Sequence, residues 1–264
     1  MKKLALASLL LATTAVSAHT LFILPSHFVA SKTGTWVSAD VSAGNMTFAV
    51  DKGVSPDNVR LVNPQGQVET IAHKYQGKRK SQVDVELTQE GTYRLEMAGP
   101  ARYFTAYKVN GERKRLMADK ESRAKELPAN ATDVVTMQNR NRSMAFITVN
   151  KPSNKVLELT NQGLEFKSSV HPADIVAGEP VTFTFLVDGK PAAGVELDVS
   201  TEGERYRDEA GRIEFKTDAT GQFSYTPSKA GAFLIEAHYS NKTATAKADQ
   251  QNEGLTLTLE ATLP

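Results

Sequence analysis

The residues of this chain best suited to chemistry are its histidines, because an imidazole can bind a metal ion or carry a proton near neutral pH. The chain has five, at positions 19, 27, 73, 171 and 238. We expect three of them to hold a metal ion: His19 as the anchor, with His171 and His238 as further ligands. His73 is a weaker candidate, since its neighbour Lys74 would repel a cation.

His19 follows the small-residue sequence Val16-Ser17-Ala18, which is typical of a signal-peptide cleavage site. Cleavage after Ala18 would make His19 the first residue of the mature protein. Its α-amine, with a pKa near ~8, and its imidazole could then chelate one copper, nickel, cobalt or zinc ion. A histidine brace would need a second imidazole from elsewhere in the chain. The alternative is an ordinary exposed terminal histidine.

The other two candidate ligands lie in different surroundings. In residues 233–239 the apolar side chains alternate, which leaves Glu236 and His238 together on the opposite face of a strand. They could converge on one ion, or they could be a solvent-facing polar pair. His171 precedes Pro172, which favours a loop or turn, and Asp174 is near enough to assist it. The alternative for His171 is a histidine that only shapes the turn.

Several other chemistries leave no trace in the sequence. There is no HExxH, GxSxG or phosphate-binding loop, and no GxGxxG followed by an acid. The chain has no cysteine, which excludes disulfides, thiolate metal sites and cysteine nucleophiles. We therefore expect a binding protein and not an enzyme.

The first 18 residues predict export. Lys2 and Lys3 precede an apolar run over residues 4–16, which is shorter than the ~20 residues that span a bilayer. A single-pass anchor at this run is the alternative. Removal of residues 1–18 from the 264 would leave 246, with 29 Lys and Arg against 30 Asp and Glu, a net charge of −1. We expect a soluble periplasmic protein without a membrane span, and the balanced charge argues against nucleic-acid binding.

The apolar pattern after residue 20 has the period of β-strands. We expect an all-β protein of two β-sandwich domains, the second immunoglobulin-like, with one short helix over residues 116–127 before Pro128. The polar segment 150–154 marks the boundary between residues 19–150 and residues 155–264. Expected strands include residues 35–41, 58–62, 82–87, 92–97, 103–109, 133–137, 144–149, 181–187, 194–200, 222–226, 232–239 and 255–259.

Several segments resemble one bacterial family, the domain-of-unknown-function family 4198. They are residues 19–25, 91–94, 171–174, 177–179, 188–194, 205–208 and 217–223, and most of them are turn motifs. Members of that family are often labelled periplasmic components of nickel or cobalt uptake. The resemblance implies a protein that binds nickel or cobalt and passes the ion to a membrane transporter.

Two other functions stay open at the level of sequence. One is a copper-binding protein that uses His19 in a histidine brace. The other is a non-catalytic module that recognises an envelope protein or glycan, in which the histidines have no role.

Overall fold

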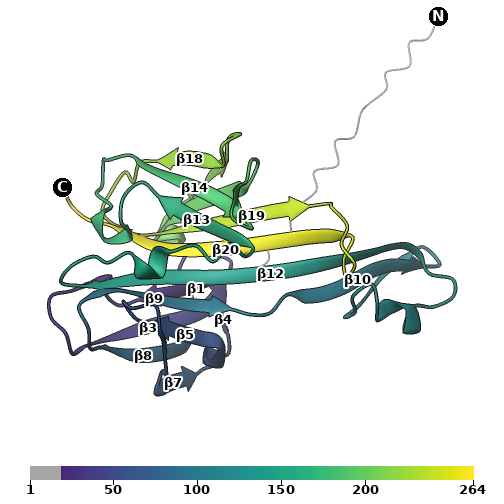
Figure 1. The fold of residues 1–264 in the computed structure, drawn as a ribbon, viewed down its shortest axis with the longest axis horizontal. Helices are drawn as coiled ribbons and strands as arrows, with labels where there is room; N and C mark the ends of the chain where they lie inside the picture. Colours follow the sequence, from purple (N-terminus) through teal and green to yellow (C-terminus); the bar gives the residue numbers. More distant parts are fainter. Residues whose placement is uncertain (1–18) are drawn as a thin grey trace, which may run out of the picture.

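The computed structural model describes residues 19–264, and its regular structure is almost entirely β-strand (Figure 1). The strands form three sheets, which confirms the all-β prediction. The first sheet has the strand order β1-β3-β8-β7, with β4 added to β3. Its strands are β1 (Thr20–Pro25), β3 (Thr35–Gly44), β4 (Lys52–Gly53), β7 (His73–Gln76) and β8 (Ser81–Leu87).

The second sheet runs through the whole molecule. Its main order is β17-β16-β19-β20-β12-β9-β5-β6; β10 and β2 also pair with β12, and β11 pairs with β10. The strands are β2 (Val29–Ala30), β5 (Val59–Val62), β6 (Val68–Glu69), β9 (Gly91–Ala98), β10 (Arg102–Val109), β11 (Glu112–Leu116), β12 (Thr132–Val149), β16 (Glu196–Thr201), β17 (Ile213–Lys216), β19 (Gly231–Asn241) and β20 (Gln250–Ala261).

The third sheet is small. It contains β13 (Leu164–Ser168), β14 (Val181–Val187), β15 (Lys190–Pro191) and β18 (Gln222–Tyr225). Five short 3₁₀ turns connect strands in the described chain: η1 (Pro56–Asn58), η2 (Arg123–Lys125), η3 (Lys155–Leu157), η4 (Pro172–Asp174) and η5 (Glu204–Tyr206).

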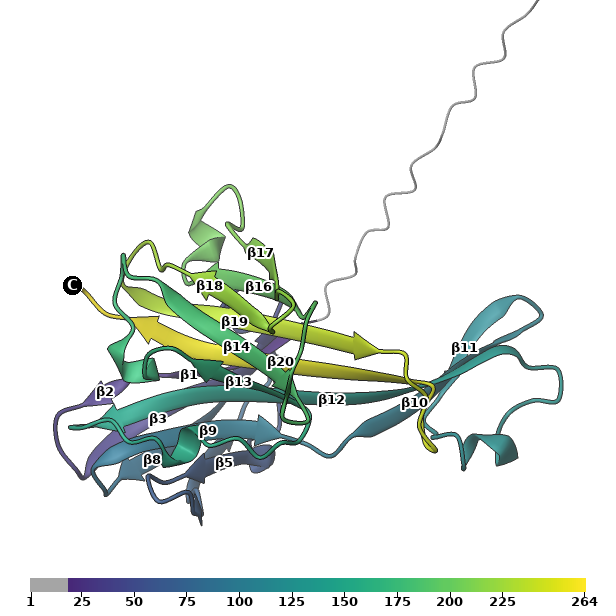
Figure 2. The same ribbon diagram turned by 45° about the horizontal axis from the view of Figure 1, so that its top comes forward.

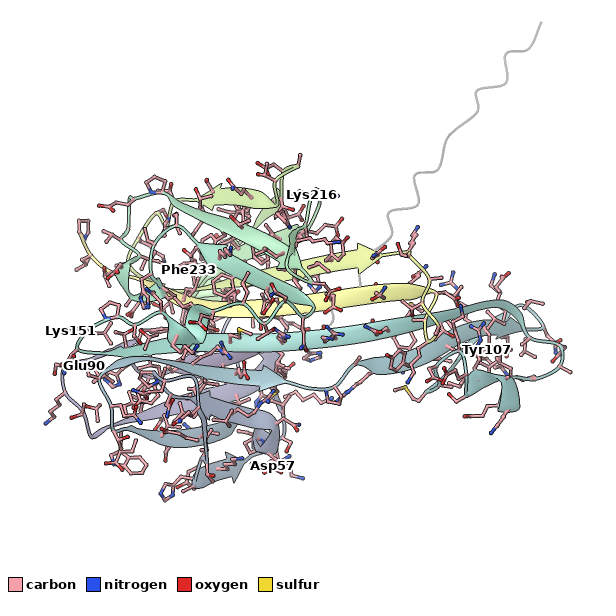
Figure 3. The ribbon with its side chains drawn as sticks, in the orientation of Figure 1. Asp57, Glu90, Tyr107, Lys151, Lys216 and Phe233 are labelled. Atoms are coloured by element: carbon pink, nitrogen blue, oxygen red, sulfur yellow. The ribbon has the colours of Figure 1, made fainter. Side chains whose placement is uncertain are left out.

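The long second sheet supplies one layer to each of two sandwiches. In the first, alternate residues of β3 and β8 pack on β9 and β12 around the fully buried Ile23, Tyr93 and Ile147. In the second, the third sheet covers β16, β19 and β20, and aromatic side chains fill the core, with Phe183 and Phe223 stacked at 5.4 Å. Phe233, labelled in Figure 3, belongs to this second core. The two sandwiches therefore share a continuous backbone ladder.

β12 joins the two sandwiches. Two strands were expected here, over residues 133–137 and 144–149, because the residues between them are polar. The structure has a single 18-residue strand, since β20 pairs with it in parallel from Met137 to Ala145, across the whole polar stretch. Pairing with β20 supports the backbone across this stretch, between the segments of β12 that pair with β10 and with β9, so the strand does not need apolar side chains to continue.

An arm projects from the body at the end opposite Lys151 and Glu90 (Figures 2 and 3). It consists of β10, β11 and the first half of β12, and Tyr107 lies on it. The helix expected over residues 116–127 lies here but is reduced to the 3₁₀ turn η2. Leu116 ends β11, and Asp119 accepts hydrogen bonds from the backbone and hydroxyl of Ser122, which close a turn in place of a regular helix.

The described residues contain no helix that is long and apolar enough to cross a membrane. The expected signal peptide, residues 1–18, lies outside the described residues.

Candidate functional site

His19 stands at the start of β1, the edge strand of the first sheet. Its Nε2 lies 2.9 Å from Oδ2 of Asp51, and both side chains are about two-fifths exposed, at 42% and 43%. Oδ1 of Asp51 also lies 3.7 Å from Arg79. The imidazole is thus accessible and already has an oxygen partner of the kind that divalent metals accept.

The next residue connects β1 to the second sandwich. The hydroxyl of Thr20 donates a hydrogen bond of 2.6 Å to Oε2 of Glu236, and Oε1 of Glu236 lies 3.0 Å from Nε2 of His238. The carbonyl of Leu21 accepts a further bond from Thr256 of β20. Because adjacent Cα atoms are ~3.8 Å apart, these contacts fix the backbone of His19 close to the Glu236–His238 pair.

The Glu236–His238 pair shows the expected strand geometry and a strong mutual effect. The hydrogen bond to Glu236 is the main reason that the pKa of His238 is raised. Burial opposes ionisation of Glu236, but hydrogen bonds from His238 and Thr20 lower the pKa of this carboxyl below its ordinary value. The pair is therefore a carboxylate bound to an imidazole that is readily protonated.

A second carboxyl lies beside this pair. Asp198 of β16 is directly opposite both Glu236 of β19 and Glu214 of β17. Burial and these two like charges raise the pKa of Asp198, although Arg212 offsets part of the effect. Acids placed opposite each other across strands destabilise a sheet unless a cation lies among them. Arg212 supplies part of that charge.

A small cavity lies among these groups. It has a volume of about 10 Å³, roughly that of one water molecule. Thr20, Asp198, Arg212 and Glu236 contribute to its wall, together with apolar side chains of β1 and β19. Hydroxyl, carboxylate and guanidinium groups thus surround a water-sized space under the first residues of β1.

His171 was predicted as a further ligand, and the structure places it apart from His238. Strand pairing places His238 level with Asn141 of β12, whereas the contacts of His171 place it level with Thr148. The seven steps along the strand from residue 141 to residue 148 span roughly 23 Å at ~3.3 Å per residue. His171 therefore cannot reach an ion that His238 holds.

The ring of His171 has a structural role instead. Its Nδ1 accepts a hydrogen bond of 3.0 Å from the backbone N–H of Ala173 and caps η4, while Nε2 lies 3.2 Å from the carbonyl of Ser153 and 3.1 Å from the hydroxyl of Thr92. Burial lowers its pKa, so the ring is neutral, and its Nδ1 lone pair is already occupied. Both ring nitrogens of His171 therefore have hydrogen-bond partners in the structure.

The remaining two histidines lie elsewhere. Nδ1 of His27 is 3.0 Å from the hydroxyl of Ser26. His73 is exposed and packs edge-on against Trp36, with ring centroids 5.4 Å apart. Among residues 19–264 no three His, Asp or Glu side chains form a group that could hold a metal ion. The α-amine that cleavage would create at His19 is a further donor, outside this set of side chains.

Sequence reasoning did not identify Asp51, Thr20 or Asp198 as neighbours of the candidate ligands. Asp51 lies in a loop without any motif, and its proximity to His19 depends on how residues 45–53 fold back on β3. Asp198 carried a partial signal, because the alternation of residues 194–200 places it on a polar face. Only the register of β16 and β19 shows that it is opposite Glu236.

The comparisons with known proteins identify a family. Similar solved structures include the D0–D1 domain of intimin, at 11% identity and a TM-score of 0.24, covering 90% of this chain and 96% of that one. The Escherichia coli adhesin FdeC matches at 17% identity and a TM-score of 0.24, covering 93% and 66%. A DUF4785 family protein from Legionella pneumophila matches at 11% identity and a TM-score of 0.26, covering 81% and 52%.

Structural similarity at this level carries no conclusion about function. None of the curated proteins compared with the chain matches it. The family model described as "Domain of unknown function (DUF4198)" matches residues 16–241, most of the chain. The protein therefore belongs to the DUF4198 family.

Proposed function

We propose that the mature protein binds a divalent transition-metal ion through His19 and serves nickel or cobalt uptake in the periplasm. The observation that carries this proposal is the chain of contacts from Thr20 to Glu236 and from Glu236 to His238. It holds the first residues of β1 next to a carboxylate and a second imidazole. A terminal α-amine at this position would add a further nitrogen donor to the two imidazoles.

The donor set follows from the geometry around β1. His19 contributes its α-amine and imidazole after cleavage. The imidazole contacts Asp51 in the structure, and a small rotation of the terminal residue could turn it from Asp51 to the metal ion. His238 or Glu236 would complete the site from β19. Amine, imidazole and carboxylate donors suit nickel, cobalt, copper and zinc, and the Irving–Williams order favours copper among them.

The cellular role rests on the predicted export signal and on the label common in the family. In this proposal the protein receives the ion in the periplasm and delivers it to a membrane transporter. The copper alternative uses the same residues in a histidine brace, with His19 giving two nitrogens and His238 the third. The two versions differ in the metal and share the site.

Calorimetric titration of correctly processed protein with Ni²⁺, Co²⁺, Cu²⁺ and Zn²⁺ tests the proposal. We expect a 1:1 complex with a Kd well below ~100 μM, a range that ordinary surface histidines can reach. His19→Ala and His238→Ala should each weaken binding at least about tenfold, whereas the control His73→Ala should not change it.

A processing control isolates the terminal amine. One additional residue before His19 moves the free amine away from the imidazole but leaves every side chain in place. We expect this extension to lower the affinity as much as His19→Ala does. Equal affinity of the extended and the native proteins would refute the terminal chelate.

The projecting arm favours a second candidate function, that of an interaction module of the cell envelope. The exposed run Arg113-Lys114-Arg115 lies on β11 of the arm, which projects away from both hydrophobic cores. An anionic envelope glycan would suit this charge. Co-sedimentation with peptidoglycan or lipopolysaccharide tests it: the double variant Arg113→Glu/Arg115→Glu should lose binding, and unchanged binding would exclude the arm.

A further inference from the structure

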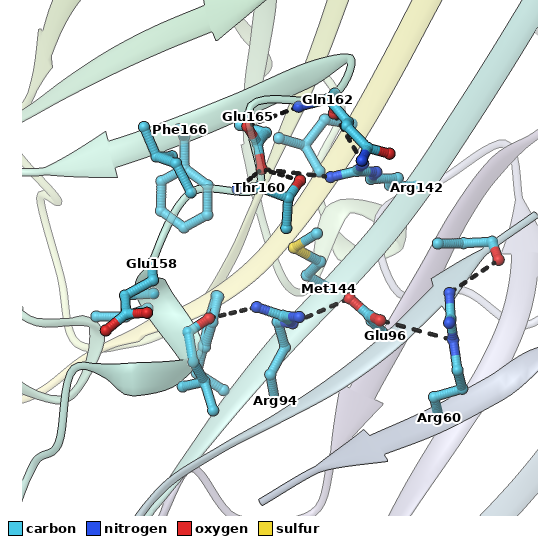
Figure 4. A pocket seen from close by; sticks show the side chains of 16 residues that line it. Arg60, Arg94, Glu96, Arg142, Met144, Glu158, Thr160, Gln162, Glu165 and Phe166 are labelled. Atoms are coloured by element: carbon cyan, nitrogen blue, oxygen red, sulfur yellow. Dashed lines mark hydrogen bonds and ion pairs between the residues drawn. The ribbon is translucent and has the colours of Figure 1, made fainter. Parts of the chain in front are cut away.

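A cavity of about 280 Å³ opens on the opposite side of the second sheet from the first sheet, away from His19 (Figure 4). β5, β9 and β12 form its floor, and the segment from η3 to β13 forms its wall. Its volume is close to the lower end of small-molecule sites, about 300 Å³. The lining combines apolar side chains, among them Met144, Phe146 and Phe166, with three arginines, Arg60, Arg94 and Arg142.

The carboxylates near this cavity are mostly occupied by other donors. Glu165 accepts hydrogen bonds from the backbone N–H and the hydroxyl of Thr160, at 2.8 and 2.7 Å, and one of 3.3 Å from the backbone of Gln162. Arg142 is only its distant partner, at 3.8 Å. Glu158 is bound to Lys155 at 2.6 Å. Neither acid therefore saturates a guanidinium of the cavity.

Glu96 is the remaining acid, and it is shared by two arginines. Its oxygens lie 3.6 Å from Nε of Arg60 and 3.0 Å from Nε of Arg94. One carboxylate between two guanidiniums leaves a local positive charge. Nε of Arg94 is buried and makes no hydrogen bond, despite its closeness to Glu96.

The guanidiniums keep several N–H groups for another acceptor. Each guanidinium carries five donors. Arg94 donates to the carbonyl of Val156 and Arg142 donates to that of Gln162 at 2.8 Å. Both side chains are only 16% exposed. With five donors and one such hydrogen bond each, both guanidiniums have N–H groups left that can bind an acceptor in the cavity.

We propose that this cavity binds a small organic carboxylate with an apolar chain or ring. The planar guanidiniums of Arg94 and Arg142 would bind its carboxylate in the bidentate manner typical of arginine. The side chains of Met144, Phe146 and Phe166 would cover its apolar part. The cavity shares no residue with the proposed metal site, so a negative result at one site does not affect the proposal for the other.

Titration of the wild-type protein with three probes tests the inference: octanoate, octan-1-ol and acetate. Octanoate has both features of the proposed ligand, octan-1-ol has only the apolar chain, and acetate has only the carboxylate. We expect octanoate to bind at least about tenfold more tightly than either of the others. Equal binding of octanoate and octan-1-ol, or no heat with octanoate at ~10 mM, would overturn the proposal.

Variants locate the site. Arg142→Gln should weaken octanoate binding about tenfold or more, while Arg102→Gln, on the exposed face of the arm, should leave it unchanged. Thermal unfolding checks that each variant is folded. If Arg142→Gln does not fold, Arg60→Gln replaces it, because Arg60 lies at the edge of the cavity and is 47% exposed. Octanoate affinity that is unaffected by the folded variant would show that the three arginines serve only to join the strands.

Discussion

Asp249 should anchor the projecting arm to the second sandwich, and its replacement by asparagine tests this. The carboxylate precedes β20 and accepts hydrogen bonds from the backbone N–H of Thr136 at 2.9 Å and from Arg123 at 3.1 Å. Nζ of Lys120 lies 2.9 Å from its other oxygen. The backbone bond from Thr136 contributes most to lowering the pKa of Asp249 from 3.8 to about 2, followed by the two cations.

The size and sign of the effect follow from this pKa. A depression from 3.8 to about 2 corresponds to about 2.4 kcal/mol at ~1.36 kcal/mol per pKa unit. The side chain is 30% exposed, and solvent screening reduces the expected value to about 1–2 kcal/mol. Because the folded-state pKa is the lower one, this stabilisation is complete above the unfolded-state value near 4 and is lost as the pH falls through about 2.

Chemical denaturation of the wild type and Asp249→Asn between pH 7 and pH 2 measures the difference. We expect the variant to be less stable by about 1–2 kcal/mol at pH 7, and the two proteins to converge as the pH approaches 2. Hydrogen exchange should become faster in residues 118–127 of the variant, since the anchor holds that segment. Asp208→Asn, at an exposed position, is the control. A constant difference from pH 7 to pH 2 would refute the linkage argument.

Two further changes test other parts of the fold. Glu204→Gln removes a charge that is 93% buried beside Arg212 and should lower the free energy of unfolding by about 1–3 kcal/mol in urea titrations; an unchanged midpoint would show that the ion pair contributes nothing. Gly221→Ala places a Cβ 2.6 Å from the carbonyl of Phe185, whereas Gly34→Ala meets only open space at a similar positive φ. Thermal unfolding should therefore show a larger loss for Gly221→Ala, and equal losses would mean that backbone conformation alone decides both.

The strands were predictable because their alternation reflects local burial. Residues 82–87 illustrate this, since Val83, Val85 and Leu87 all enter the core of the first sandwich. The continuity of β12 was not predictable, because Gln138 to Ser143 carries no apolar alternation and is held by β20, which is more than a hundred residues distant in sequence. The expected helix failed for a related reason: good helix formers in residues 118–127 could not outweigh the local turn at Asp119 and Ser122.

The candidate site was predictable only in part. Alternation correctly placed Glu236 and His238 on one face, and the cleavage signal singled out His19. The contact of Thr20 with Glu236 joins residues 216 positions apart, and no local pattern encodes such a contact. The sequence left two roles open for His171, because a histidine before proline looks the same in sequence whether it binds an ion or caps a 3₁₀ turn.

The shared sheet decides what kind of site β1 and β19 can form. Domains joined only by a linker usually move relative to each other, and a site between them must close around its ligand. Here β12 and β20 are paired from Met137 to Ala145, and Thr256 of β20 donates to the carbonyl of Leu21 in β1. These bonds hold β1 against the sheet that carries His238 before any ion arrives. In the proposed metal site, binding would therefore not have to bring the two strands together, which lowers its entropy cost, and removal of residues 1–18 would supply the terminal amine.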